Sequence, residues 1–411
     1  MEAKRIILAP SGSDGDTFPM LLLAKKLQAR GHSIVVCGPP HSRALFEDAG
    51  FTFEASGLDI RGYVQSRDLS NLSLRARYQD LQFLRKDIHL QSVAIRLHVK
   101  GAYAVFTGGF NYVGSTIAEA YGLKHLHVFH VPNVYPTDQY PCMNVPWQNL
   151  PLWMNQLTWK MNDFLQNRFF KSTLNSVRKA LSLPPVKNVW QELTQNSILA
   201  VPRAIHQVPE SVRDLHAQTS YWFPEIQEDL PKSLLDFIQA GPAPFYFGLG
   251  SMGTVEKSKI ILSVREVCQR LKLRAVISRG WADFPGESDS NLYFVGRVSH
   301  EKLFQKMRFV VHHGGPGTVS TAAKAGIPQV IIPHIFDQFY WGERLFRLNI
   351  APKPIMRSAF SAQKLQESLE SLLQNPEMFV NAKRIHETIL TEKGIDGFFE
   401  PSLLVKLGLE L

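Results

Sequence analysis

The sequence predicts an α/β protein built from two Rossmann-like, doubly wound domains. Three observations lead to this prediction. The chain has 411 residues, enough for two domains with full cores. Apolar runs of strand length alternate with helical apolar spacing at the N-terminus and again from Pro244 onward. Between these alternations, residues 203–244 contain five prolines and little periodicity, which is typical of a linker.

These observations place the domain boundaries. We expect an N-terminal domain over residues 1–212 and a C-terminal domain over residues 213–392, of which 213–243 include the linker. The last segment, 393–411, is expected to pack back on the N-terminal domain. The two halves share an architecture but show no residue-level repeat.

The N-terminal half begins with a regular alternation. We expect a strand at Lys4–Ala9, a turn at Pro10–Pro19, a helix at Met20–Ala29, a strand at Ser33–Cys37 and a helix at Ser42–Ala49. Residues 59–100 interrupt it with helical spacing from Leu72 to Val99 and a charge of +4, from eight basic and four acidic residues. The strand Ser197–Val201 is expected to be the last of this half.

A long loop and an aromatic helix lie in the middle of this domain. The loop, 130–151, is longer than a simple connection needs, which favours a functional role. The helix after it, Leu152–Leu181, contains several large aromatic residues: Trp153, Trp159, Phe164, Phe169 and Phe170. Two interpretations stay open for these aromatics. They pack the helix on the sheet, or they form a hydrophobic acceptor-binding pocket with a basic rim that faces a membrane.

The C-terminal half repeats the alternation of strands and helices. The expected strands are Phe245–Leu249, Arg274–Ser278, Leu292–Val295, Phe309–Val311 and Ile327–Ile332. The expected helices are Ile260–Leu271, Glu301–Lys306, Thr318–Lys324, Ala362–Leu373 and Pro376–Thr391.

Composition narrows the class of protein. The chain is 45% hydrophobic and 20% charged, with a net charge of +9, as in an ordinary globular protein. Its three cysteines are scattered, which favours reduced thiols and a cytoplasmic location. We expect no signal peptide and no membrane-spanning helix, so any membrane contact is peripheral, through the basic N-terminal domain. We expect no nucleic-acid partner.

A glycine turn at the start of the predicted helix 318–324 is a candidate phosphate site. Gly314, Gly315 and Gly317 precede a helix N-terminus, whose unpaired N–H groups and dipole favour an anion. His313 would donate a ring N–H, and Thr318 would add a hydroxyl. The alternative is a tight turn with two histidines in a satisfied core.

Three further motifs are ambiguous from residue chemistry alone. Gly248–Gly253 matches a dinucleotide-binding pattern, but the next strand ends without an acidic residue, so an NADP-dependent oxidoreductase is a remote alternative. Asp16 is either a helix cap or a general base at the mouth of the first turn. Asp337 and Gln338 are either a solvated loop or a pair that binds sugar hydroxyls.

Taken together, these motifs resemble the inverting nucleotide-sugar glycosyltransferases of the GT-B fold, in the UDP-glycosyltransferase family. The resemblance is to the bacterial branch with glycopeptide-antibiotic and sterol glucosyltransferases and rhamnolipid rhamnosyltransferases. Four stretches carry it, in the family's order: Gly12–Pro19, Phe247–Gly253, Val295–His300, and His312–Thr318 leading to Asp337 and Gln338. It is dense over residues 1–57 and 220–355.

The resemblance implies an acceptor-binding N-terminal domain and a nucleotide-sugar-binding C-terminal domain that face a central cleft. It implies that Asp16 is the catalytic base that deprotonates an acceptor hydroxyl. The other implied roles are the donor diphosphate for Ser13, Ser251, His313, Gly317 and Thr318, the nucleobase for Arg297 and Val298, and the sugar for Asp337 and Gln338. It implies no metal and no cofactor, a UDP-sugar donor, and a hydrophobic small-molecule, lipid or sterol acceptor.

Three positions depart from the family. Arg297 stands where plant members have a base-stacking tryptophan, which leaves UDP and dTDP both open. Pro316 replaces an alanine, and Asp14 replaces an arginine beside the implied base. A sugar-nucleotide-binding pseudoenzyme and a UDP-sugar epimerase on the same fold remain alternatives.

Overall fold

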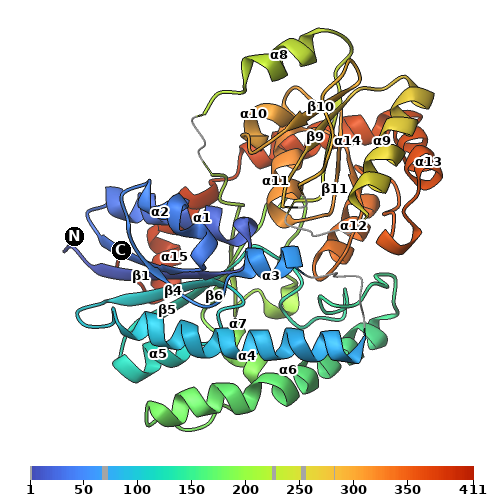
Figure 1. Cartoon of the computed structure of the whole chain (residues 1–411). Coiled ribbons are helices and arrows are strands. Elements are labelled where there is room, and N and C mark those ends of the chain that lie inside the picture. Colours follow the sequence, from blue (N-terminus) through green and yellow to red (C-terminus); the bar gives the residue numbers. More distant parts are fainter. Residues whose placement is uncertain (1, 67–72, 225–227, 251–255, 282) are drawn as a thin grey trace.

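The computed structural model describes residues 2–66, 73–224, 228–250, 256–281 and 283–411. It contains one parallel sheet in each half of the chain, with helices on both faces (Figure 1). The predicted class, α/β with two doubly wound halves, is confirmed.

The first sheet has seven strands in the order β3-β2-β1-β4-β5-β6-β7. They are β1 (Arg5–Ser11), β2 (Ser33–Gly38), β3 (Thr52–Ala55), β4 (Ala104–Gly109), β5 (Lys124–Phe129), β6 (Ser197–Ala200) and β7 (Ala217–Thr219). All its pairs are parallel, and Ser11 lies opposite Gly109 at the carboxyl ends of β1 and β4. These ends form one edge of the sheet, where ligands of open α/β folds bind.

The expectation that residues 197–201 form the last strand of this sheet is wrong. β7 pairs with β6 at the edge. It is only three residues long, so it has too few residues to show a periodic pattern in the sequence.

Helices of the first half cover both faces of this sheet. They are α1 (Asp14–Ala29), η1 (Pro40–Ser42), α2 (Arg43–Glu47), α3 (Ile60–Ser66), α4 (Leu74–Arg96), α5 (Gly114–Tyr121), α6 (Leu152–Ala180), α7 (Val189–Thr194) and η2 (Glu210–Val212). α1 begins at Asp14 and not at Met20, because Ser13 and Asp16 cap it there and the helix continues through Pro19.

The second sheet has five parallel strands in the order β10-β9-β8-β11-β12. They are β8 (Phe245–Gly248), β9 (Ala275–Ser278), β10 (Leu292–Val295), β11 (Val310–His312) and β12 (Gln329–Ile331). Its helices are α8 (Lys232–Gln239), α9 (Lys257–Leu271), α10 (His300–Phe304), α11 (Pro316–Ala325), α12 (Gln338–Arg347), η3 (Arg357–Ala359), α13 (Ala362–Leu373) and α14 (Pro376–Leu390).

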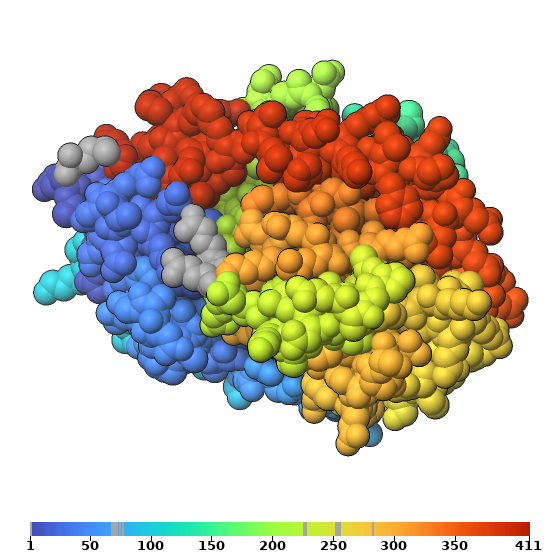
Figure 2. Space-filling view, turned by 90° about the horizontal axis from the view of Figure 1, so that it is seen from above, coloured from blue at the N-terminus to red at the C-terminus, as the bar shows by residue number. Residues whose placement is uncertain are grey.

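The end of the chain returns to the first sheet. After α14 come η4 (Gly394–Phe399) and α15 (Pro401–Lys406). Phe398 and Leu404 are buried in the same core cluster as β1 and α1 residues. Figure 2 shows this last part of the chain, in red, crossing from the C-terminal half to the blue N-terminal half.

Burial follows the layering. Ile6, Ile7, Leu8 and Ala9 on β1 are fully buried, as expected for a parallel strand that is covered on both faces. The three cysteines are buried and unpaired. In the part of the chain that the structure describes, no helix combines the length and the apolar character that a membrane crossing requires.

Candidate functional site

Asp16 lies in the first turn of α1, close to the carboxyl end of β1. Its Oδ2 atom accepts hydrogen bonds from the Ser13 backbone N–H at 2.8 Å and from the Ser13 hydroxyl at 3.3 Å. Ser13 is the N-cap residue, so the two residues form a capping box. The interpretation of Asp16 as a helix cap is confirmed. The capping hydrogen bonds are made by Oδ2 and do not involve the other carboxylate oxygen, Oδ1.

Two glycines shape the backbone around this carboxylate. Gly12 has a φ of +133°, and a Cβ there would collide with the Asp16 carboxylate. Gly109 has a φ of +64°, and a Cβ there would collide with the Ser11 carbonyl. Glycine is required at both positions, because other residues rarely adopt these angles and would clash.

The Asp16 side chain is half-buried. Burial raises the pKa of Asp16 to about 6, against the opposing effect of the hydrogen bonds from Ser13. A carboxylate with a pKa near neutral can accept a proton at physiological pH, which is the requirement for a general base.

His312 supports the glycine turn after β11 from within the core. It is fully buried, and its Nε2 lies 2.9 Å from the Gln329 side-chain oxygen. Its Nδ1 accepts a hydrogen bond from the Gly314 N–H at 3.1 Å. For His312, the expectation of a satisfied core histidine is therefore correct.

His313 is also buried but differs in its bonding. Its Nδ1 has no hydrogen-bond partner among the described residues. Its ring fits beside Gly250 and Gly315, where a Cβ on either glycine would collide with it. Burial lowers the pKa of His313 to about 4, so at neutral pH the ring is uncharged and keeps one N–H to donate.

The predicted phosphate-binding residues meet at the N-terminus of α11. The helix begins at Pro316, which needs no N–H partner at this first position. Gly317 and Thr318 are half-buried in the same first turn, whose N–H groups have no partner within the helix. Ser251, the fourth predicted residue of this group in the C-terminal half, lies outside the described residues.

Asp337 and Gln338 lie at the start of α12. Asp337 is buried, and its Oδ2 has no hydrogen-bond partner in the described part of the chain. The Gln338 side-chain oxygen accepts from the backbone N–H groups of His334 at 2.8 Å and Ile335 at 3.1 Å. Gln338 therefore shapes the preceding loop, a role that the sequence did not indicate, and neither residue belongs to a solvated loop.

Asp337 and Asp16 come from opposite halves of the chain, and the charge of Asp16 acts on Asp337. Burial raises the pKa of Asp337 to about 7, and the negative charge of Asp16 contributes to that rise. The carboxyl groups therefore belong to one electrostatic environment. The rings of Phe110 and Phe336, which adjoin Gly109 and Asp337 in the sequence, lie 5.6 Å apart between centroids. The fold therefore brings the carboxyl end of β4 and the sugar-binding candidate together.

Tyr221, in the segment between β7 and α8, belongs to this environment and was missed in the sequence. Its hydroxyl lies against Gly317, since a Cβ at Gly317 would be 2.9 Å from it. Burial, with the nearby charge of Asp16, raises the pKa of Tyr221, so its hydroxyl stays protonated. Nothing in the proline-rich linker distinguishes this tyrosine from its neighbours.

Trp281 joins the two halves and was also missed. Its indole Nε1–H donates to Asp14 Oδ2 at 3.1 Å, two residues from Asp16. The His41 ring meets the Trp281 ring edge-on, with 5.4 Å between centroids. The Trp281 backbone N–H donates to the Gly250 carbonyl at 3.0 Å, which links this contact to the His313 turn. The sequence signal that could have revealed Trp281 is its place beside Gly280, just after the parallel strand β9.

The two predicted nucleobase residues lie on the loop after β10. The Arg297 guanidinium lies over the Phe18 ring of α1, 4.6 Å from its centroid. Val298 is half-buried and packs against the core cluster around β8 and α10. Arg297 thus faces the N-terminal half.

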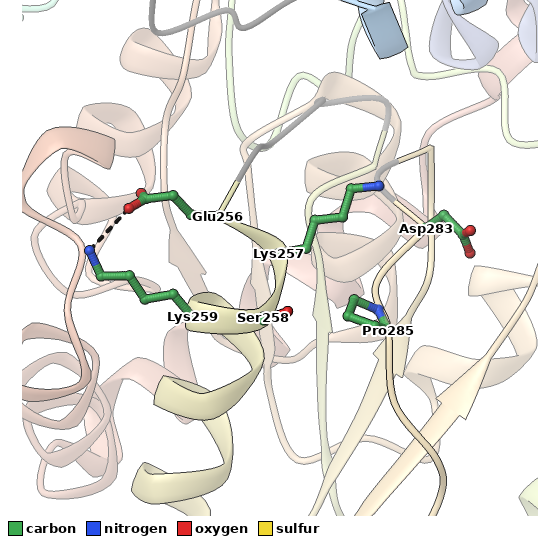
Figure 3. A pocket seen from close by; sticks show the side chains of 6 residues that line it. All are labelled: Glu256, Lys257, Ser258, Lys259, Asp283 and Pro285. Atoms are coloured by element: carbon green, nitrogen blue, oxygen red, sulfur yellow. Dashed lines mark hydrogen bonds and ion pairs between the residues drawn. The ribbon is translucent and has the colours of Figure 1, made fainter.

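A separate hollow flanks the start of α9 (Figure 3). Lys257 extends toward Asp283 across it, and Glu256 pairs with Lys259 at 3.0 Å. The hollow shares no residue with the predicted site.

Comparisons with known proteins agree with this architecture. The family model "Erythromycin biosynthesis protein CIII-like, C-terminal domain" matches residues 282–394. The vancomycin aglycone glucosyltransferase of Amycolatopsis orientalis is 29% identical over 412 residues, covering 94% of each chain. The sterol 3-beta-glucosyltransferase UGT80B1 of Arabidopsis thaliana is 26% identical over 419 residues, covering 95% of this chain and 66% of its own.

Solved structures share the fold. The calicheamicin glycosyltransferase CalG4 superposes with a TM-score of 0.73 at 18% identity, over 99% of each chain. The glycosyltransferase VinC, solved in complex with dTDP, gives a TM-score of 0.69 at 17% identity, over 98% of this chain and 99% of its own. At these identities the likeness establishes the GT-B fold.

Proposed function

The chain belongs to the UDP-glycosyltransferase family of GT-B glycosyltransferases, and from that premise we propose that it transfers a hexose from a nucleotide-sugar to a hydroxyl of a hydrophobic acceptor. The acceptor class is a lipid, a sterol or another apolar small molecule. The donor carries UDP, as the family resemblance implies, or dTDP, which is bound in a structure with the same fold.

One observation carries the proposal. Trp281 links the Asp16 turn to the His313 turn: its indole N–H donates to Asp14 at 3.1 Å, and its backbone N–H donates at 3.0 Å to Gly250, which lies against His313. A base on one domain and a diphosphate site on the other is the arrangement that direct transfer between two substrates needs.

The proposed reaction is a single displacement. Asp16 accepts the proton of the acceptor hydroxyl, and the resulting oxygen attacks the anomeric carbon. The bond from that carbon to the diphosphate breaks, and the nucleoside diphosphate leaves with the electron pair. Attack from the face opposite the leaving group inverts the anomeric configuration.

The C-terminal residues would hold the leaving group. The first-turn N–H groups of α11, the Thr318 hydroxyl and the neutral His313 ring would donate to the diphosphate, with Ser13 and Ser251 beside it. Charge-assisted hydrogen bonds are worth about 1.5–3 kcal/mol each, so a few of them would hold a diphosphate without a metal. Asp337 and Gln338 would bind the sugar, and Arg297 and Val298 would lie at the base.

The test has two stages. Thermal shifts with UDP, dTDP and NADPH identify the nucleotide, and a shift with NADPH alone would support an oxidoreductase instead. The protein is then incubated with UDP- or dTDP-sugars and lipid or sterol extracts, and mass spectrometry detects the glycosylated product. Proton NMR gives the anomeric configuration of this product. Binding without transfer would indicate a pseudoenzyme, and a converted donor without acceptor would indicate an epimerase. Loss of transfer in EDTA, with recovery on added metal, would refute the metal-free scheme.

A further inference from the structure

One face of α6 is apolar and exposed in the described part of the chain. Trp153, Leu157, Met161 and Phe164 are 65%, 52%, 53% and 63% exposed. At 100° per residue they lie within a stripe roughly 80° wide along the first half of the helix. We call these four residues the α6 stripe. Two of the helix's aromatic residues thus do not pack against the sheet.

The opposite face of α6 already forms the core. Trp159, Phe170, Leu174 and Val177 are buried there. A helix at the surface of a globular domain normally turns a polar face to solvent, so a second apolar face indicates a partner. In Figure 1, α6 lies beside α4 at the outer side of the N-terminal half.

Basic residues lie on the same face, one of them within the stripe and three between it and the end of the helix. Lys160, Arg168, Lys171 and Lys179 fall within roughly the same sector as the stripe. Lys160, Arg168 and Lys179 are exposed, and Lys171 is half-buried. An apolar stripe followed by cations fits a surface that is apolar inside and anionic outside, which a lipid bilayer with acidic headgroups provides.

The stripe lies at one end near the candidate site. α12 begins at Gln338, in the site, and its last residue, Arg347, lies 3.4 Å from both the Gln148 carbonyl and the Asn149 side-chain oxygen. These residues immediately precede α6. A helix of ten residues spans roughly 15 Å, so the loop before α6 contacts α12 about one helix length from the sugar-binding candidates.

We propose that the α6 face is the surface by which this protein docks on an anionic lipid bilayer. The stripe enters the boundary between headgroups and acyl chains, and the basic residues contact the headgroups. Docking in this way sets the beginning of α6, and the loop before it, against the membrane. A membrane-dissolved acceptor would then reach the candidate site from the side where α12 meets this loop.

Vesicle flotation of the purified full chain tests the docking. Vesicles of phosphatidylcholine with phosphatidylglycerol are compared with pure phosphatidylcholine, without donor or acceptor. We expect binding to the anionic vesicles that weakens as salt rises. The double variant Trp153→Glu/Phe164→Glu should lose at least about tenfold in affinity, because each change removes a large apolar side chain from lipid. The matched control Leu262→Glu, at a site 64% exposed on α9, should bind normally.

The charged half of the face has its own test. Lys160→Gln/Arg168→Gln should weaken binding to anionic vesicles by about fivefold per charge removed and flatten the salt dependence. Lys383→Gln, exposed on α14, is the control and should change little.

Three outcomes would overturn the proposal. They are no binding of the wild type to anionic vesicles, equal binding to neutral vesicles, and equal loss in the control variants. Light scattering provides a further check, because a dimer that Trp153→Glu/Phe164→Glu dissociates would assign the stripe to a second copy of the chain. Circular dichroism of each variant shows whether the fold is retained. Because no sugar is transferred in these assays, their failure would leave the proposed function untouched.

Discussion

Replacing Asp16 by asparagine separates its two roles. In the structure, Asp16 Oδ2 accepts from the Ser13 N–H at 2.8 Å and caps α1. The amide oxygen of an asparagine at this position can accept the same hydrogen bond, so the helix start should survive. The amide cannot take up the proton of the acceptor hydroxyl as a carboxylate does. Asp16→Asn should therefore fold normally and lose catalysis.

The size of the loss follows from the proposed chemistry. General-base assistance contributes about 10² to 10⁴ in rate, so kcat should fall by that factor. In the wild type, kcat/KM should rise with pH as Asp16 loses its proton, with a midpoint near its pKa of about 6. At pH 5 the value should be about tenfold below the plateau. The residual activity of Asp16→Asn should lack this titration.

The assay measures product by mass spectrometry between pH 5 and pH 8, with nucleotide affinity from thermal shifts. Asp16→Ala serves as the matched variant, because it removes both the base and the cap. It should lose activity to the same extent as Asp16→Asn but be about 1 kcal/mol less stable than Asp16→Asn, which has the same charge and keeps the cap.

Two results would refute this reasoning. If Asp16→Asn kept near-normal turnover, Asp16 would be a cap and not a base. If it lost activity and nucleotide binding together, the defect would lie in the donor site.

Three further predictions concern other residues of the candidate site. Asp337→Asn should raise the melting temperature at pH 8, and raise it less at pH 5. The pKa of Asp337 rises from 3.8 to about 7 on folding, so its ionisation destabilises the folded protein as pH rises, by at most about 4 kcal/mol. An equal difference from wild type at the two pH values would contradict this. Gly250→Ala should weaken UDP binding at least tenfold in calorimetry, because the φ of Gly250 is +57° and the new Cβ would collide with His313. Normal affinity would argue against His313 as a donor-site residue. Trp281→Phe should raise KM about three- to tenfold with a smaller change in kcat, because it removes the hydrogen bond to the half-exposed Asp14. An unchanged KM in steady-state kinetics would show that this contact does not hold the domains together.

Much of the fold was readable because it depends on local pattern. Continuous apolar runs such as β1 and glycine stops such as Gly326, with a φ of +71°, are properties of a few neighbouring residues. The edge strand β7 escaped prediction because its three residues are held by β6 and not by their own periodicity. The first helix was predicted to start too late, because its start depends on the side-chain bond between Ser13 and Asp16.

The candidate site, like the fold, has features that follow from local sequence and features that depend on the surroundings of each residue. The sequence by itself determined the glycine turn, the adjacent histidines and the Asp16 turn as chemical candidates. It did not distinguish His312, bonded to Gln329, from His313, whose Nδ1 is unpartnered among the described residues. That difference depends on what surrounds each ring.

Only the tertiary structure decided which candidates lie together. The bond from Trp281 to Asp14 joins residues 267 positions apart, and Tyr221 reaches Gly317 from the linker. The raised pKa of Asp337 likewise depends on burial and on a charge from the other half of the chain. Periodicity and turn chemistry act over a few residues, whereas proximity, burial and pKa are set by segments that meet only when both sheets have formed.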